Sequence, residues 1–125
     1  MIRPVVLALA LLAPIEAQNQ TAEPQVQASS GQGAVLRGLD KVNGQTVDVE
    51  ILSGGGLAVF GLEVELADCR YPTNNPTGDA YAFLTIRERT RPDVLFQGWM
   101  IASSPALNPL DHSRYDVWVI RCITS

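Results

Sequence analysis

The chain has 125 residues, a formal net charge of −4 and a sequence pI of about 4.8. Its nine Lys and Arg residues form no basic stripe, which argues against binding to nucleic acid and against simple adsorption to anionic lipid. The length is enough for one hydrophobic core and no more.

The amino terminus has the three-part layout of a secretory signal peptide. Arg3 supplies a positive charge, residues 5–13 form an apolar run, and Ala17 is a small residue at the expected cleavage point. The run is shorter than the roughly 20 apolar residues that cross a bilayer. We therefore expect a cleaved signal peptide at residues 1–17 and no membrane insertion afterwards. An uncleaved signal that anchors a structural envelope protein is the alternative.

Residues 18–33 are rich in Gln, Ser and Gly and contain almost no large apolar side chains. Such a segment cannot bury enough surface to offset the entropy lost on ordering. The composition predicts a disordered leader at residues 18–33, followed by a single domain at residues 34–125.

Beyond the leader the apolar residues recur mostly with period two, which indicates strands with one buried face. Residues 47–51 and 62–66 alternate in this way. Asn43 and Gly44 supply a tight turn before the first stretch, and the glycine-rich residues 53–56 supply a flexible turn before a short apolar run at residues 57–60.

Two later stretches, residues 80–86 and 94–102, are apolar on both faces and are typical of central strands. The charged residues 87–92 between them predict a hairpin loop. Two prolines interrupt residues 104–112, so at most one helical turn is expected there.

The last predicted strand spans residues 115–123, with its valines on one face and Trp118, Ile120 and Cys122 on the other. Together these stretches predict an all-β domain. We expect a small antiparallel β-sandwich or barrel of about six or seven strands with little helix.

Two cysteines, Cys69 and Cys122, remain after the signal peptide. In an exported chain an even count favours one disulfide, which would tie the last strand to the body of the sheet. Two buried free thiols are the alternative. The spacing does not match the C-x-x-C pattern of a redox site.

The only histidine, His112, follows Asp111, and with Ser103 or Ser104 it would complete the residue types of a Ser-His-Asp triad. However, Pro105 follows the serine pair, so the sequence lacks the nucleophile elbow of the α/β-hydrolases. A small hydrolase that uses His112 with Ser103 or Ser104 is the alternative function.

Other sequence patterns give weaker indications of a functional site. The turn at residues 53–56 lacks the lysine of a phosphate-binding loop, and Glu63 and Glu65 have the spacing of solvent-facing residues on one strand. The oxygen-rich residues 73–79 could bind calcium, but Asp79 is their single charged side chain. Histidine and cysteine are too few for a zinc site. We expect no catalytic residue, metal or cofactor.

Aromatic residues and a long Ser/Pro/Asn loop gather between residues 99 and 115, and loops on rigid scaffolds often carry function. The candidate recognition surface comprises Trp99, Ser103, Ser104, Asn108, His112 and Tyr115.

Five blocks of the sequence resemble one family, the alphaproteobacterial exported proteins of domain of unknown function 2155. Gln97 departs slightly, because a small residue is expected there. The resemblance covers about Val35 to Cys122 and implies a periplasmic or cell-envelope location without implying catalytic residues. The blocks are residues 69–72, residues 79–84, residues 98–108 without Ile101, residues 115–119 and Cys122.

These observations favour a non-enzymatic accessory or binding domain in the periplasm or cell envelope. The expected partner is another envelope protein or a component of the cell wall, and no nucleic acid is expected.

Overall fold

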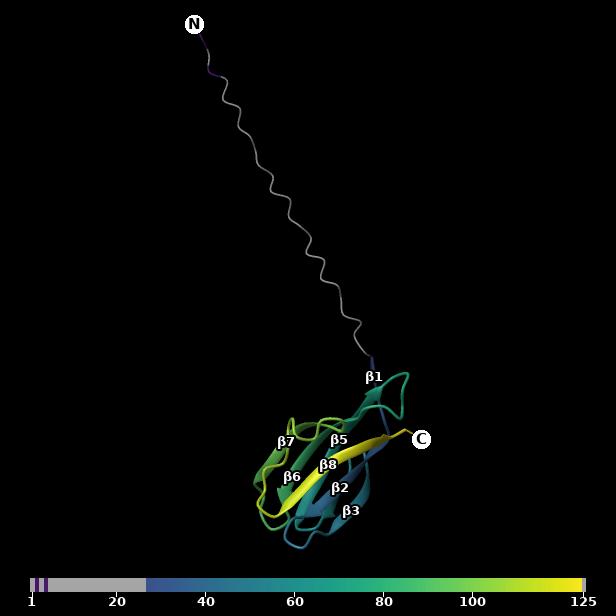
Figure 1. Ribbon diagram of the computed structural model, residues 1–125, viewed down its shortest axis with the longest axis vertical. Coiled ribbons are helices and arrows are strands. Elements are labelled where there is room, and N and C mark those ends of the chain that lie inside the picture. Colours follow the sequence, from purple (N-terminus) through teal and green to yellow (C-terminus); the bar gives the residue numbers. More distant parts are fainter. Residues whose placement is uncertain (1, 3, 5–26, 125) are drawn as a thin grey trace.

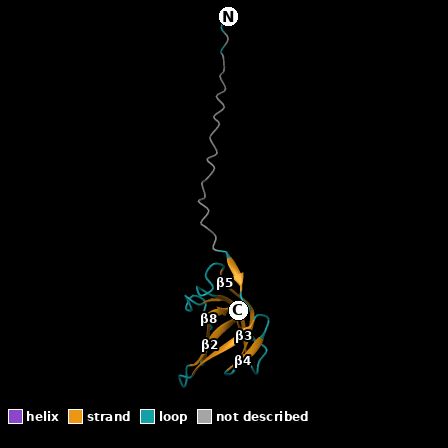
Figure 2. Cartoon of the chain, turned by 90° about the vertical axis from the view of Figure 1, so that its right-hand side faces the viewer, coloured by secondary structure: helices purple, strands orange, loops and turns teal. Residues whose placement is uncertain are grey.

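The computed structural model describes residues 2, 4 and 27–124 and is all-β (Figure 1). The expected signal peptide and residues 18–26 lie outside the described residues, apart from Ile2 and Pro4. Within the described part, eight strands form two antiparallel sheets joined by loops (Figure 2). No helix in this part is long and apolar enough to cross a membrane.

The first sheet has five strands in the order β1-β5-β6-β7, and β4 pairs with β5 as well. All of its pairings are antiparallel. Its strands are β1 (Ala28–Ser30), β4 (Gly56–Val59), β5 (Leu62–Pro72), β6 (Tyr81–Glu88) and β7 (Val94–Ile101).

The second sheet has three strands in the order β3-β2-β8. Its central strand, β2 (Gly33–Asp40), was not predicted, because its apolar residues and glycines show no period-two alternation. Most of this strand is buried, as expected where both faces of a strand are covered. It pairs with β3 (Thr46–Leu52) on one side and with β8 (Tyr115–Ile123) on the other.

The ordered domain begins earlier than residue 34. Strand β1 pairs with β5, with Ser29 opposite Tyr71, and the backbone amide of Gly31 donates to the carbonyl of Cys69 at 2.7 Å. The predicted end of the disordered leader at residue 33 is therefore wrong, because residues 28–30 already form a paired strand. Composition could not reveal this, because a polar segment can pair through its backbone without burying apolar side chains.

The inner faces of the two sheets form one hydrophobic core. Leu36, Leu62, Val64, Leu84 and Ile86 are completely buried. The core side chains come from both sheets, so the architecture is a sandwich and not a closed barrel.

The two cysteines form a disulfide, with Cα atoms 5.7 Å apart and a sequence separation of 53 residues. Each cysteine follows a β-bulge. In β5 the register skips Ala67, and in β8 it skips Ile120. Because each extra residue reverses the alternation, Cys69 and Cys122 both turn toward the core.

The prediction that Cys122 shares a face with Trp118 and Ile120 was therefore wrong. Strict alternation holds only up to the bulge. Cys69 lies inside β5, since the pairing of this strand with β1 continues to Pro72.

Strand β7 is an edge strand, although its composition predicted a central one. The loop at residues 102–114 covers part of this edge. The side-chain amide of Asn108 donates to the carbonyl of Trp99 at 2.9 Å, and the amide of Ser104 donates to the carbonyl of Ile101 at 3.1 Å. Leu110 in the same loop is 6% exposed and joins the core. The loop covers part of the backbone edge of β7, but the side chains of Val94, Leu95 and Trp99 stay exposed, so the apolar composition of this strand does not reflect burial.

Candidate functional site

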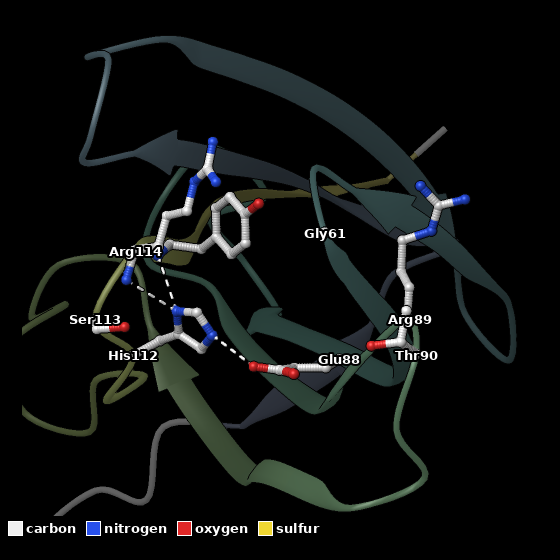
Figure 3. A pocket seen from close by; sticks show the side chains of 8 residues that line it. Gly61, Glu88, Arg89, Thr90, His112, Ser113 and Arg114 are labelled. Carbon is white, nitrogen blue, oxygen red and sulfur yellow. Dashed lines mark hydrogen bonds and ion pairs between the residues drawn. The ribbon is translucent and has the colours of Figure 1, made fainter.

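A hollow of about 660 Å³ lies at the end of the sandwich where the β4–β5 turn, the end of β6 and the start of β8 meet. We call it the turn pocket (Figure 3). It is lined by Gly61, Glu88, Arg89, Thr90, His112, Ser113, Arg114 and Tyr115.

Both ring nitrogens of His112 are engaged. The Nδ1 atom accepts hydrogen bonds from the backbone amides of Arg114 at 3.0 Å and Tyr115 at 3.1 Å. Because Nδ1 accepts, the neutral ring carries its proton on Nε2, which then donates to Glu88 Oε1 at 3.0 Å. The imidazole therefore positions the start of β8 and has no free nitrogen to act as a base.

The serines proposed as nucleophiles make other contacts. Ser103 Oγ donates to Asp79 Oδ2 at 2.6 Å, and the Ser103 amide donates to Asp79 Oδ1 at 3.0 Å. Ser104 is part of the turn that bonds to Ile101. Within residues 27–124, neither serine is hydrogen-bonded to His112, so the structure does not assemble the nucleophile–base pair that a triad needs.

Asp79 is also the charged member of the loop that could have bound calcium. Burial acts to raise the pKa of this carboxyl, but the hydrogen bonds from Ser103 and from the Ala80 amide outweigh it, so the pKa is lowered. Its oxygens are thus already bound within the protein. No group of three or more His, Cys, Asp or Glu side chains in the described part could hold a metal ion.

A buried carboxylate supports the turn pocket from behind. Asp40, at the end of β2, is 3% exposed, and its oxygens accept from Arg114 Nη2 at 3.1 Å and from Arg114 Nε at 3.3 Å. These hydrogen bonds lower the pKa of Asp40 and raise that of Arg114. Lys41 Nζ donates to the carbonyl of His112, which ties the β2–β3 turn to the same loop.

The ring of Tyr115 lines the turn pocket and packs against two other rings. Tyr115 stacks with Phe60 at a centroid distance of 5.8 Å and with His112 at 5.3 Å. Phe60 has a φ of 52°, a conformation that is costly for a bulky side chain. A Cβ atom at Gly61 would lie 2.9 Å from the Tyr115 hydroxyl, so only glycine leaves room for that ring.

A second surface lies on the outer face of the first sheet. We call it the aromatic face and define it by Tyr81, Phe83, Trp99 and Ile101. Trp99 is 41% exposed, and its ring meets Phe83 edge-on at a centroid distance of 5.3 Å. A hollow of about 350 Å³ on this face is lined by Trp99, Tyr81, Ile101, Arg70 and Ala28.

The predicted recognition residues therefore do not form one surface. Trp99 belongs to the aromatic face, and Asn108 supports its backbone from the covering loop. His112 and Tyr115 line the turn pocket at the other end of β7 and β8. Ser103 and Ser104 hold the loop itself.

Sequence reasoning missed Tyr81 and Arg70 on the aromatic face and Glu88 and Arg114 in the turn pocket. Of these residues, Tyr81 had a usable signal. Tyr81 and Phe83 alternate with buried residues in a predicted strand, which indicates an aromatic outer face. Glu88 and Arg114 had none, since the packing of one sheet on the other brings them together from distant positions.

The remaining motifs have structural roles. Residues 53–56 lead from β3 into β4, and Gly54 takes a φ of 83° that suits a turn. Glu63 and Glu65 project from the outer face of β5, where Glu65 pairs with Arg87 at 3.1 Å. This is the solvent-facing arrangement expected from their spacing.

Comparison with known proteins gives a family whose description names no activity. Residues 34–122 match the family model described as an uncharacterised protein conserved in bacteria, domain of unknown function 2155. An uncharacterised protein of Rickettsia prowazekii (strain Madrid E) is 26% identical over 87 residues, which are 67% of this chain and 56% of that protein. The chain thus spans just over half the length of that relative. No solved structure matches.

Proposed function

We propose that this chain, which belongs to the bacterial family of domain of unknown function 2155, is a non-enzymatic binding domain of the cell envelope that is exported to the periplasm. Trp99 is the observation that carries this proposal. Its indole is 41% exposed on a rigid sheet and is held by Phe83. Exposed tryptophans with fixed rotamers are frequent anchors of protein interfaces.

The chemistry of the hollow beside Trp99 favours a protein segment as its occupant. The side chains of Ile101, Tyr81 and Trp99 offer mainly apolar surface. Arg70, the charged side chain at its rim, is paired with Asp68 at 3.1 Å. A sugar would need several free polar groups to bind its hydroxyls, whereas an apolar side chain needs only this apolar surface. We therefore propose that a segment of another envelope protein inserts an apolar side chain here.

The place of the hollow agrees with this function. Ala28 of β1 borders it, so it lies at the end where the chain enters from the expected signal peptide. A partner bound there would sit close to the amino-terminal side of the domain, whether or not the signal is cleaved.

Site-specific photocrosslinking in intact cells tests the proposal. A benzoylphenylalanine at exposed Gln97, beside Trp99 on β7, should form an adduct with one envelope protein. The Trp99→Ala change should reduce that adduct about tenfold, the usual scale for a hot-spot residue. The same crosslinker at exposed Glu50 on β3 of the other sheet is the matched control.

Three outcomes would overturn the proposal. The adduct could form equally from position 50, it could persist in Trp99→Ala, or it could be digested by muramidase, which would identify a cell-wall glycan as the occupant. Circular dichroism of purified Trp99→Ala confirms that the variant stays folded. Mass spectrometry of the native chain tests export, because cleavage after Ala17 leaves Gln18 as the first residue.

A further inference from the structure

The edge of the second sheet at β8 has no strand partner. Strand β8 ends the order β3-β2-β8 and pairs with β2 on one side only. The amide of Lys41 donates to the carbonyl of Arg114 at 2.7 Å. Because the direction of the backbone groups alternates along an antiparallel pair, this bond sets the amides and carbonyls of Val117 and Val119 toward the open edge. In agreement, the Val117 amide donates to Asp116 Oδ1 at 2.9 Å and not to β2.

The loop that precedes β8 does not pair with this edge. Within residues 27–124, no backbone hydrogen bond joins residues 116–122 to the loop at residues 102–114. A hollow of about 370 Å³ lies between Pro105 and Pro109 of that loop and the side chain of Trp118. An open strand edge of this kind is a template for pairing with another chain.

The outward side chains of β8 carry one charge of each sign. Asp116 and Trp118 project from the outer face, and the bulge at Ile120 returns Arg121 to the same face. Within residues 27–124, neither Asp116 nor Arg121 takes part in an ion pair. A carboxylate and a guanidinium therefore flank Trp118 along the open edge.

A two-fold axis through Trp118 makes this edge complementary to itself. When two β8 strands pair antiparallel about that axis, Val117 exchanges backbone hydrogen bonds with Val119 of the second copy. The two Trp118 side chains then lie opposite each other on the outer face, where aromatic pairs stabilise a sheet. On each side of the axis, Asp116 lies opposite Arg121 of the second copy, so opposite charges meet twice.

Charge disfavours the same arrangement at the other edge of this sheet. Asp48 and Glu50 project from the outer face of β3. A centred antiparallel pair of two β3 strands would place Asp48 opposite Glu50 of the second copy. Like charges directly opposite each other destabilise a sheet, so self-pairing is favoured at β8 and not at β3.

We infer that the open edge of β8 binds the same edge of a second copy of this chain and joins the two three-stranded sheets into one. On pairing, the Val117 amide exchanges Asp116 Oδ1 for the Val119 carbonyl of the second copy. The released carboxylate binds Arg121 of that copy through charge-assisted hydrogen bonds. The hollow beside Trp118 gives the second indole room. The aromatic face belongs to the other sheet, so the inference does not depend on the proposed function.

Sedimentation equilibrium of the native chain and of two charge-reversal variants tests the inference. The wild type should show a concentration-dependent equilibrium between monomer and dimer. Asp116→Arg and Arg121→Asp each place two like-charge pairs in the interface and should raise the dimer dissociation constant more than about tenfold. An equimolar mixture of the two variants should form a heterodimer, because the two changed charges then face each other.

A variant of the other edge separates this interface from general charge effects. Glu50→Arg also reverses a charge on an outward side chain of the same sheet, and it should leave the dissociation constant within about twofold. Equal weakening by Glu50→Arg and Asp116→Arg would overturn the inference. So would a wild-type chain that stays monomeric at every concentration, a dimer that both β8 variants leave intact, or β8 variants that stay monomeric when mixed.

Discussion

Asp40 and Arg114, 74 positions apart in the sequence, form an ion pair. The Asp40 side chain is 4% exposed and the Arg114 side chain is 50% exposed, so only the arginine contacts solvent. Asp40 also accepts from the amide of Val42 at 3.0 Å, so one carboxylate holds both the β2–β3 turn and the start of β8. The turn pocket depends on this link, because Arg114 and His112 are positioned by the same loop.

Removing the charge of Asp40 should destabilise the domain. We expect Asp40→Asn to lower the melting temperature by about 5 °C, because Arg114 loses its partner and a buried hydrogen-bond network is broken. Asp48→Asn is the control. Asp48 pairs with Arg37 at 2.7 Å on the surface, with both side chains more than 40% exposed, so the change should be under about 1 °C. Similar losses in the two variants would contradict the role assigned to Asp40.

Stability should fall in acid. The folded state lowers the pKa of Asp40 and of Asp79, so it binds fewer protons than the unfolded chain near the ordinary aspartate pKa of about 3.9. This contribution is fully present above that pKa and is lost as the pH falls through the lower folded values. Urea unfolding at a series of pH values should show the decline, and Asp40→Asn should make it shallower. An unchanged slope in the variant would exclude Asp40 as a source.

Removing the disulfide should cost about 2–5 kcal/mol of unfolding free energy. The bridge closes a loop across 53 positions and joins the two sheets, so its loss frees the unfolded chain and loosens the end of β8. The test is denaturant unfolding of the Cys69→Ala/Cys122→Ala double variant against the wild type under oxidising conditions. Coincident unfolding curves would show that the bridge adds nothing to stability.

A methyl group at Gly61 should disturb the turn pocket. In Gly61→Ala the new Cβ would meet the Tyr115 hydroxyl at 2.9 Å and a ring carbon at 3.0 Å. We expect a loss of about 1–3 kcal/mol from overpacking. The Tyr115→Phe change removes the nearer atom, so the double variant should lose less than the sum of the single variants. Strict additivity in a double-mutant cycle would show that the ring and the turn are not in contact.

His112 should prove to be a structural residue. His112→Ala leaves two backbone amides without an acceptor, and we expect a loss of about 1–3 kcal/mol. His112→Asn retains an acceptor near the position of Nδ1 and should recover most of that loss in thermal unfolding. A hydrolase that needs the imidazole would lose turnover in both variants. Loss of turnover in a His112→Asn variant that keeps its stability would support the hydrolase alternative.

Period-two patterning located β3, β5 and β8, and apolar runs located β4, β6 and β7. Residues 115–123 were predicted with the bounds that β8 has, and the stretches at 47–51 and 62–66 lie within β3 and β5. Strand β2 was not predicted, because its glycines and continuous apolar residues show no alternation. The bulges at Ala67 and Ile120 also escaped, since an extra residue changes the facing of later side chains without a local signal.

By itself the sequence determined the all-β class, because alternation is local, and it restricted Cys69 and Cys122 to one intramolecular bridge or two free thiols. The structure shows the bridge. Only the tertiary structure decided which surfaces could bind. It separated Trp99 from His112, engaged both nitrogens of that imidazole, and paired Arg114 with Asp40. These relationships depend on strand register and loop packing between residues far apart in the chain, which no local pattern encodes.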